Sequence, residues 1–290
     1  LFYGRGPVKW SYNTSLATFV HENNPYSSYG YYFLSDTSPV KTLAKETSVT
    51  GASLQVNTYD DYFVHEKDQV SVNKSGRELF GESFSLNTGQ TFPFAVPGIT
   101  DDPAKISFRF IAKPTTGQAL VILTAGTQPL LNASIPRSSI DDSYTKALEL
   151  SRTVSWNGAK TPDVQVGITY SRNTNDLAHL DYIRLHAVRT LKMYGPYTFF
   201  RSIASVDNVT RFVLQEASAN VKIWDVTNPV LPVEMETTLN GTECSFTIPA
   251  SNTLREFVAV DISKTLPAPE TVGVVSNQNL HALEQTDMVI

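Results

Sequence analysis

Strict alternation of apolar and polar residues recurs along this chain and limits the folds open to it. In residues 105–113 every second side chain is apolar, and residues 163–170 repeat the pattern. Leu54 and Val56 show it more briefly. Such period-two runs, with turns rich in Gly, Pro, Asn and Asp between them, are typical of half-buried antiparallel strands. Their spacing suits a β-sandwich or jelly roll better than βαβ units, so the sequence predicts an all-β protein.

Three segments depart from this pattern. Residues 178–192 place apolar side chains at helical spacing and also on one strand face, and the neighbouring strands favour a single long strand. Residues 60–66 and 280–285 are the segments for which we expect helix.

Prolines and glycines divide the chain into three expected parts. Pro93, Pro97 and Gly98 interrupt the pattern near residues 85–103, and two prolines form an extended linker at 266–270. We therefore expect a smaller N-terminal β subdomain at 1–85 and a jelly-roll-like β-sandwich at 86–265. Residues 266–290 are expected to be a linker and the first strand of a further domain, because the apolar run Asp287–Ile290 opens a strand that needs partners beyond it.

The composition excludes several classes of partner. The net charge is −5 and no run of Lys or Arg is present, whereas nucleic-acid binding needs a clustered basic surface. No stretch of 18 apolar residues occurs, so we expect no membrane-spanning segment.

A single cysteine, Cys244, rules out an internal disulfide. Alternation in residues 243–248 puts it on the same face as Phe246 and Ile248. On such a face cysteine behaves as a small apolar residue and its thiolate is disfavoured. The sequence predicts a structural cysteine and no thiol nucleophile.

The five histidines do not show the spacing of a metal site. His179 and His186 are seven positions apart, so a strand should place them on opposite faces. His65 precedes Glu66 without a second histidine, and His179 with Asp181 would share a strand face without forming a triad. The remaining histidines are His21 and His281.

Three aspartate pairs are the other possible ligands for a cation. They are Asp60-Asp61, Asp101-Asp102 and Asp141-Asp142. None has the alternating carboxylates and the glycine of an EF-hand loop, so we expect solvated turns, with a calcium site as the alternative. We expect no cofactor and no metal.

The aromatic stretch at residues 26–33 is the best candidate for binding. Tyr26, Tyr29, Tyr31 and Tyr32 could stack on sugars, as exposed aromatic rings do in carbohydrate-binding β-sandwiches. The alternative is ordinary cross-strand packing.

Several short motifs occur in a fixed order along almost the whole chain. They are Leu1–Trp10, Asn23–Ser27, Tyr31–Leu34, Ser75–Glu82, Leu180–Ile183, Lys192–Gly195, Phe200-Arg201, Ile223–Pro229, Asn277–His281 and Asp287–Ile290. Together they resemble the N-terminal, pre-catalytic region of the sortases of the Bacteroidetes type IX secretion system. This PorU-like family is related to the gingipain cysteine peptidases. Leu79 stands where the pattern leads us to expect Trp.

The resemblance implies an enzyme at the outer membrane or cell surface of a Gram-negative bacterium. Such an enzyme is secreted across the inner membrane and removes the C-terminal sorting domain of secreted cargo. Its catalytic His and Cys belong to a caspase-like α/β domain that would begin near Asp287, so no catalytic position is carried over, and His281 is not assigned one.

Three hypotheses about function follow. The first is a non-catalytic β region that scaffolds its own downstream peptidase domain and contacts cargo C-terminal domains or other secretion components. The second is a carbohydrate-binding β-sandwich that uses the tyrosines of residues 26–33. The third is a free-standing hydrolase, which the survey of candidate sites disfavours.

Overall fold

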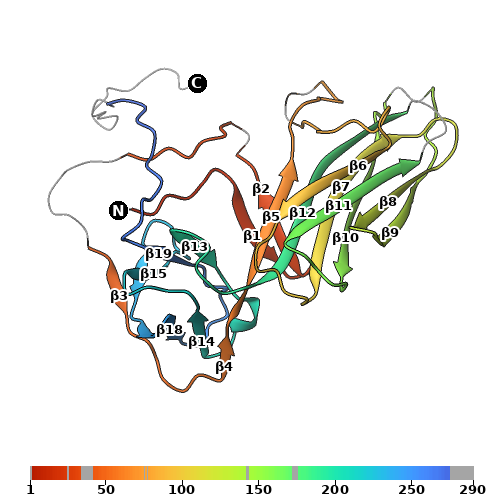
Figure 1. Ribbon diagram of the computed structural model, residues 1–290. Coiled ribbons are helices and arrows are strands. Elements are labelled where there is room, and N and C mark those ends of the chain that lie inside the picture. Colours follow the sequence, from red (N-terminus) through yellow and green to blue (C-terminus); the bar gives the residue numbers. More distant parts are fainter. Residues whose placement is uncertain are drawn as a thin grey trace.

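The protein is an all-β molecule with four larger sheets and one hairpin (Figure 1). The computed structural model describes residues 2–24, 26–33, 42–74, 76, 78–141, 144–171 and 176–274. Within these ranges the only helical element is the 3₁₀ turn η1 (Ile203–Ser205). The predicted all-β, sandwich-like fold class is confirmed.

The first sandwich consists of two four-stranded antiparallel sheets. One sheet has the order β10-β7-β12-β5 and the other the order β6-β11-β8-β9. Their strands are β5 (Thr58–Glu66), β6 (Gly89–Ala95), β7 (Ala104–Lys113), β8 (Ala119–Ala125), β9 (Gln128–Ile135), β10 (Leu148–Trp156), β11 (Asp163–Ser171) and β12 (Leu177–Thr190).

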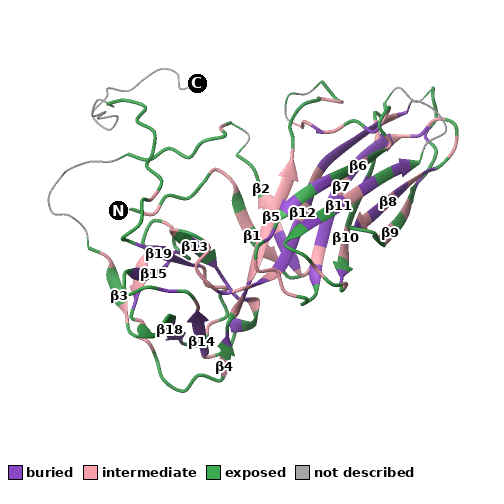
Figure 2. Ribbon diagram, viewed as in Figure 1, coloured by how far each residue is buried: buried purple, intermediate pink, exposed green. Residues whose placement is uncertain are grey.

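Alternation in the sequence produces the core between these two sheets. On β7 the four alternate residues Ile106, Phe108, Phe110 and Ala112 have no exposed surface. On β11 the residues Val164, Val166, Ile168 and Tyr170 face them from the other sheet and belong to the same core. Each fully buried side chain of this size contributes roughly 1.5–3 kcal/mol to folding, so these two strands fix the register of the sandwich. Figure 2 shows buried residues along β7, β11 and β12 of this sandwich.

The second sandwich follows β12 and adds two short strands from the N-terminal part. Its sheets have the orders β13-β19-β15-β16-β3 and β17-β18-β14-β4, in which only β3 and β4 pair in parallel with their neighbours. The strands are β3 (Ala44–Glu46), β4 (Leu54–Val56), β13 (Tyr197–Phe200), β14 (Thr210–Leu214), β15 (Val221–Asp225), β16 (Val233–Met235), β17 (Thr238–Asn240), β18 (Glu243–Ile248) and β19 (Phe257–Asp261). Four phenylalanines in mutual ring contact form the centre of its core, Phe200, Phe212, Phe246 and Phe257.

The antiparallel pair β5 and β12 connects the two sandwiches. Tyr59 on β5 and Leu191 just after β12 belong to the second core, whereas Leu185 and Ala187 on β12 belong to the first. The division into 1–85, 86–265 and 266–290 stays a prediction. The two cores do not follow these predicted boundaries. The strand β5, from the range 1–85, belongs to the first sandwich, and residues 191–261 supply most of the second.

A β-bulge on β12 changes which side chains face the first core. The pairing with β7 shifts between Leu180 and Tyr182, and the core-facing positions change from Ala178 and Leu180 to Ile183 and Leu185. The long strand predicted for 178–192 is confirmed. The helix predicted for 60–66 is wrong, because this segment pairs along its whole length with β12. The segments 280–285 and 287–290 lie outside the described residues.

The hairpin β1 (Lys9–Asn13) and β2 (Thr18–Glu22) packs through aromatic contacts on the face of β5 and β12 that points away from the first core. Trp10 stacks on Tyr62 with ring centroids 4.2 Å apart, and Phe19 lies 5.0 Å from the rings of both Tyr62 and His186. This small aromatic layer attaches the N-terminal residues to the junction of the two sandwiches.

A charged contact fixes the far end of the hairpin. Nε2 of His21 lies 2.6 Å from a Glu66 carboxylate oxygen, and the Asn23 amide donates to the same oxygen at 2.6 Å. Arg184 donates to Nδ1 of His21, which leaves the Nε2 proton for Glu66. Burial alone would raise the pKa of Glu66, but the hydrogen bonds from His21 and the Asn23 amide and the charge of Arg184 outweigh it and lower the pKa.

We predict that Glu66→Gln removes a pH-dependent part of the stability. Because the pKa of Glu66 is lowered in the folded protein, its carboxylate stabilises the fold above the ordinary value of 4.5, and this contribution is lost as the pH falls through the lowered pKa. At pH 7 the variant should lose about 1 kcal/mol in free energy of unfolding, a modest value because solvent reaches the site. The difference from the parent protein should shrink as the pH falls below 4.5. Denaturant titration at several pH values measures it.

The matched control is Glu22→Gln, on the exposed end of the same hairpin. This variant should change the stability little at any pH. An equal effect of the two substitutions would contradict the role given to Glu66.

Candidate functional site

A buried cluster of charges occupies the junction between the two sandwiches. We call Asp60, Asp61, His186, Arg189 and Arg201 the junction cluster; all five side chains are at least 85% buried. Strand pairing explains why they meet, because β5 places the two aspartates beside His186 and Arg189 of β12. Arg201 arrives from the residue after β13.

Asp61 forms the ion pairs of this cluster. Its carboxylate lies 2.6 Å from the Arg189 guanidinium and 3.4 Å from that of Arg201. Arg189 also donates to the carbonyl of Pro97 at 2.8 Å and lies 4.1 Å from the ring of Tyr194. The cation is thus enclosed by a carboxylate, a carbonyl and an aromatic face, which compensates the loss of its hydration.

Asp60 connects the hairpin side of β5 to the second sandwich. One carboxylate oxygen lies 2.9 Å from Nε2 of His186, and the other accepts a hydrogen bond of 2.7 Å from the backbone N–H of Ile203. The predicted solvated turn at Asp60-Asp61 is therefore wrong: both residues lie on a paired strand and their carboxylates have specific buried partners.

Arg201 is the most enclosed charge, with 2% of its surface exposed. One terminal nitrogen donates to the backbone carbonyl of Asp60 at 3.1 Å, and the guanidinium lies 4.4 Å from the ring centre of Tyr62. Its Nε has no hydrogen-bond partner among the residues that the structure describes. Burial opposes its charge, but Tyr62, Glu256 and Asp61 outweigh this effect and raise its pKa, so Arg201 is a fixed cation.

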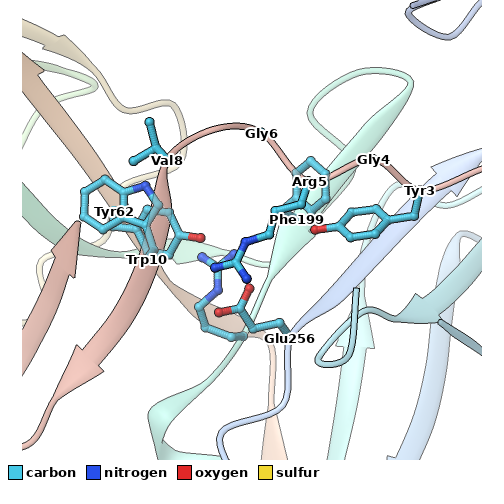
Figure 3. A pocket seen from close by; sticks show the side chains of 10 residues that line it. Tyr3, Gly4, Arg5, Gly6, Val8, Trp10, Tyr62, Phe199 and Glu256 are labelled. Carbon is cyan, nitrogen blue, oxygen red and sulfur yellow. The ribbon is translucent and has the colours of Figure 1, made fainter. Parts of the chain in front are cut away.

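A cavity of about 230 Å³ opens beside Arg201. One wall consists of Tyr3, Gly4, Arg5, Gly6 and Val8. Trp10 and Tyr62 form a second wall, and Phe199, Arg201 and Glu256 form the third (Figure 3). Arg5 enters from the N-terminal segment and Glu256 from the residue before β19, and both side chains point into the space between the rings (Figure 3).

The register of the second sandwich explains the third wall. Phe200 on β13 pairs with Phe257 on β19, and both rings point into the second core. The next positions, Arg201 and Glu256, therefore lie side by side at the end of this ladder and face away from the core. An arginine and a glutamate are thus placed together where the N-terminal segment crosses the sheet.

The phenols in the cavity stay neutral over the physiological range. Burial and then the charge of Glu256 raise the pKa of Tyr3, and burial raises the pKa of Tyr62 to about 12. The charges that face the cavity are consequently the cations Arg5 and Arg201 and the anion Glu256.

The four predicted binding tyrosines lie next to this cavity or outside it. The exposed fractions are 94% for Tyr26, 68% for Tyr29, 66% for Tyr31 and 46% for Tyr32. None lies in a strand, so the cross-strand packing considered for them does not occur. Tyr32 donates a hydrogen bond to the backbone carbonyl of Arg5 and so positions the rim of the cavity. Sugar binding by the other three tyrosines stays a prediction.

Cys244 has the structural place predicted for it. It lies 2% exposed in the second core with Phe246 and Ile248. Burial raises the pKa of its thiol despite a hydrogen bond from Thr237. A thiolate nucleophile is disfavoured at this position.

The four histidines that the structure describes each have a partner other than a metal. His65 lies 2.8 Å from Glu82, and His179 lies 3.1 Å from the carbonyl of Gly81. The prediction that His179 and His186 face opposite ways is wrong, because the bulge at Asp181 brings both onto the face away from the first core. His281 lies outside the described residues.

The Asp181 carboxylate does not pair with His179 but lies 2.9 Å from the Arg109 guanidinium.

The described residues of the other two aspartate pairs lie in turns. Asp101 accepts a hydrogen bond from the backbone N–H of Lys160, and Asp141 is exposed, as expected for a solvated turn. Asp142 lies outside the described residues. In the part of the chain that the structure describes, no three His, Cys, Asp or Glu side chains gather as metal ligands would.

Sequence reasoning missed the two arginines of the cavity. In the sequence, Arg5 and Arg201 stand out only as members of the motifs Leu1–Trp10 and Phe200-Arg201. The available signal was the position of Arg201 directly after the apolar pair Phe199-Phe200, where a buried charge needs partners.

No family model matches this chain, and no curated protein matches it. Among solved structures, it is similar to dimeric latent PorU from Porphyromonas gingivalis, with 27% identity and a TM-score of 0.86. The match covers 98% of this chain and 28% of the PorU chain. The fold of this chain is therefore PorU-like along nearly its whole length, and the chain spans little more than a quarter of that protein.

Two carbohydrate-binding modules show a weaker similarity. One is the C-terminal CBM6 of LamC, a marine laminarinase from Zobellia galactanivorans, with 14% identity, 44% of this chain covered, 98% of that chain covered and a TM-score of 0.24. The other belongs to Cellvibrio mixtus lichenase 5A, with 15% identity, coverages of 46% and 89% and a TM-score of 0.22. TM-scores this low support no argument about ligand binding.

We predict that Asp61→Asn destabilises the junction. The substitution leaves Arg189 and Arg201 buried without their shared counter-ion, which should lower the free energy of unfolding by about 3 kcal/mol. Chemical denaturation followed by circular dichroism measures the loss. Asp102→Asn is the matched control, because that carboxylate is exposed and only accepts from Thr100. A loss in Asp61→Asn no larger than in the control would contradict the structural role of the cluster.

Proposed function

We propose that this chain is the N-terminal, non-catalytic region of a PorU-like cysteine peptidase of the type IX secretion system. In this proposal it works on the outer side of the cell at the outer membrane, scaffolds the peptidase domain that follows it and contacts cargo or other secretion components. The single observation that carries the proposal is the PorU-like fold over 98% of the chain at 27% identity.

The order of motifs in the sequence supports the same proposal. The segments that resemble type IX sortases include Lys192–Gly195 and Phe200-Arg201, which the structure places at the junction between the two sandwiches. In the described ranges no helix has the length and apolar character required to cross a bilayer.

The environment of Cys244 supports a non-catalytic role for this chain. It is the only cysteine, and both its burial and its raised pKa oppose nucleophilic attack. In a cysteine peptidase the nucleophile would then have to come from the downstream domain.

We predict that Cys244→Ala leaves peptidase activity of the parent protein intact. In a bacterium that carries the parent gene and a type IX secretion system, the variant should remove the sorting domain of secreted cargo as the unaltered protein does. Mass spectrometry of the secreted cargo measures this. The same cells with residues 1–274 deleted should lose the processing, because the peptidase domain loses its scaffold.

Two results would count against the proposal. One is loss of processing in a Cys244→Ala protein that accumulates normally, which would place the nucleophile in this chain. The other is unchanged processing after the deletion, which would remove the scaffolding role.

A second candidate function is carbohydrate binding, which the exposure of Tyr26, Tyr29 and Tyr31 favours. Exposed rings of this kind can stack on the apolar face of a sugar.

We predict that Tyr29→Ala and Tyr31→Ala abolish glycan binding measured by calorimetry. The thermal midpoint of unfolding should not change, because these rings contribute little to either core. Tyr144→Ala, at a still more exposed tyrosine far along the chain, is the control. Failure of the parent chain to bind any surface polysaccharide on a glycan array would exclude this function.

A further inference from the structure

Two arginines line the cavity, and the protein does not use all of their hydrogen-bond donors. Nε of Arg201 has no partner among the described residues although the side chain is 98% buried. In the same ranges the Arg5 guanidinium and the Glu256 carboxylate take part in no ion pair. A buried guanidinium with an unsatisfied N–H is costly unless a ligand or water accepts from it, so this wall is suited to an acceptor.

The charges of the cavity select the kind of acceptor. Arg5 and Arg201 present planar N–H groups, which match the two oxygens of a carboxylate. Glu256 lines the cavity and Asp61 pairs with Arg201, and both carboxylates offset part of this positive charge. A monovalent anion fits such a balance better than a phosphate dianion, which Glu256 would repel.

The volume and the lining of the cavity indicate which kind of molecule would carry the carboxylate. A cavity of about 230 Å³ is smaller than the ~300–1,000 Å³ of sites for drug-sized ligands and cofactors. The rings of Tyr62 and Phe199 offer apolar surface beside the cations, and Phe199 is 40% exposed. One residue of a peptide fits, with its backbone N–H available for Glu256.

We propose that this cavity binds a carboxylate carried by a peptide, held between Arg5 and Arg201, with the residue that bears it packed on Tyr62 and Phe199. Arg201 is the fixed half of the site, because Asp60, Asp61 and Tyr62 hold it. Arg5 is the adjustable half, since it is exposed and its backbone alone is held, through Tyr32. This inference goes beyond the proposed function and does not rest on it.

The test is calorimetric titration of the purified 290-residue chain with four probes. Ac-Ala-Phe-Glu-Ala-NH2 supplies a side-chain carboxylate, Ac-Ala-Phe-Gly-OH a chain-end carboxylate, Ac-Ala-Phe-Gln-Ala-NH2 a neutral isostere, and inorganic phosphate a dianion. At least one carboxylate peptide should bind at least about tenfold more tightly than the glutamine peptide, and more tightly than phosphate. The comparison of the first two probes tells which source of carboxylate the site prefers.

Arg5→Gln should weaken the preferred carboxylate peptide at least about tenfold, because it removes one charged donor. Arg152→Gln is the matched control, since Arg152 is an exposed arginine on β10 away from the cavity, and it should leave the affinity unchanged. Circular dichroism of both variants shows whether the fold is intact, which the exposure of Arg5 leads us to expect.

Glu256→Gln should narrow the preference for carboxylate over phosphate, because it removes the charge that opposes a dianion. Affinities for both carboxylate peptides no higher than for the glutamine peptide, tighter binding of phosphate, no binding at millimolar concentration, or an Arg5→Gln protein that binds as Arg152→Gln does would each overturn the proposal.

Discussion

The pairing of Asp61 with Arg189 and Arg201 is the interaction on which the arrangement of the two sandwiches depends. Its partners lie 128 and 140 residues away in the sequence, so one carboxylate joins β5, the end of β12 and the residue after β13. Apolar cores hold each sandwich together but do not fix the angle between them, since hydrophobic contact is not directional. Charge-assisted hydrogen bonds are directional, and a pair that is satisfied only in one geometry selects that geometry.

The same constraint creates the cavity. Arg201 must turn toward Asp60 and Asp61, and the ladder between β13 and β19 leaves Glu256 beside it. The N-terminal segment then crosses above these charges, where Trp10 holds it by stacking on Tyr62. The aromatic rings around the cavity and the flexible Arg5 side chain do not fill the space beside the fixed Arg201. A cavity therefore remains, and some hydrogen-bond donors of its arginines have no partner in the protein.

Patterns in the sequence predicted the parts of the fold that depend on residues close together in the chain. The alternation in residues 105–113 identified β7 and its core face, and the apolar neighbours of Cys244 identified its burial. The helix predicted for residues 60–66 was wrong because the charged residues of this segment are typical of a solvated one. Their buried partners, which include His186 and Arg201, lie far away in the sequence and leave no local signal. The bulge on β12 was equally invisible, since it inserts one residue without any glycine or proline to mark it.

The candidate site was predictable only in part, for a related reason. Exposed tyrosines can be recognised from a stretch such as residues 26–33, because several aromatic side chains cannot all be buried in a short polar segment. A cavity is a property of several segments at once, and here three of them meet through register and ion pairing. Arg201 illustrates the difference: one arginine after an apolar strand signals a buried charge, but only the pairing of Phe200 with Phe257 places Glu256 next to it. The chemistry of the site therefore belongs to the tertiary arrangement, and the junction cluster both closes the fold and leaves a guanidinium available to a ligand.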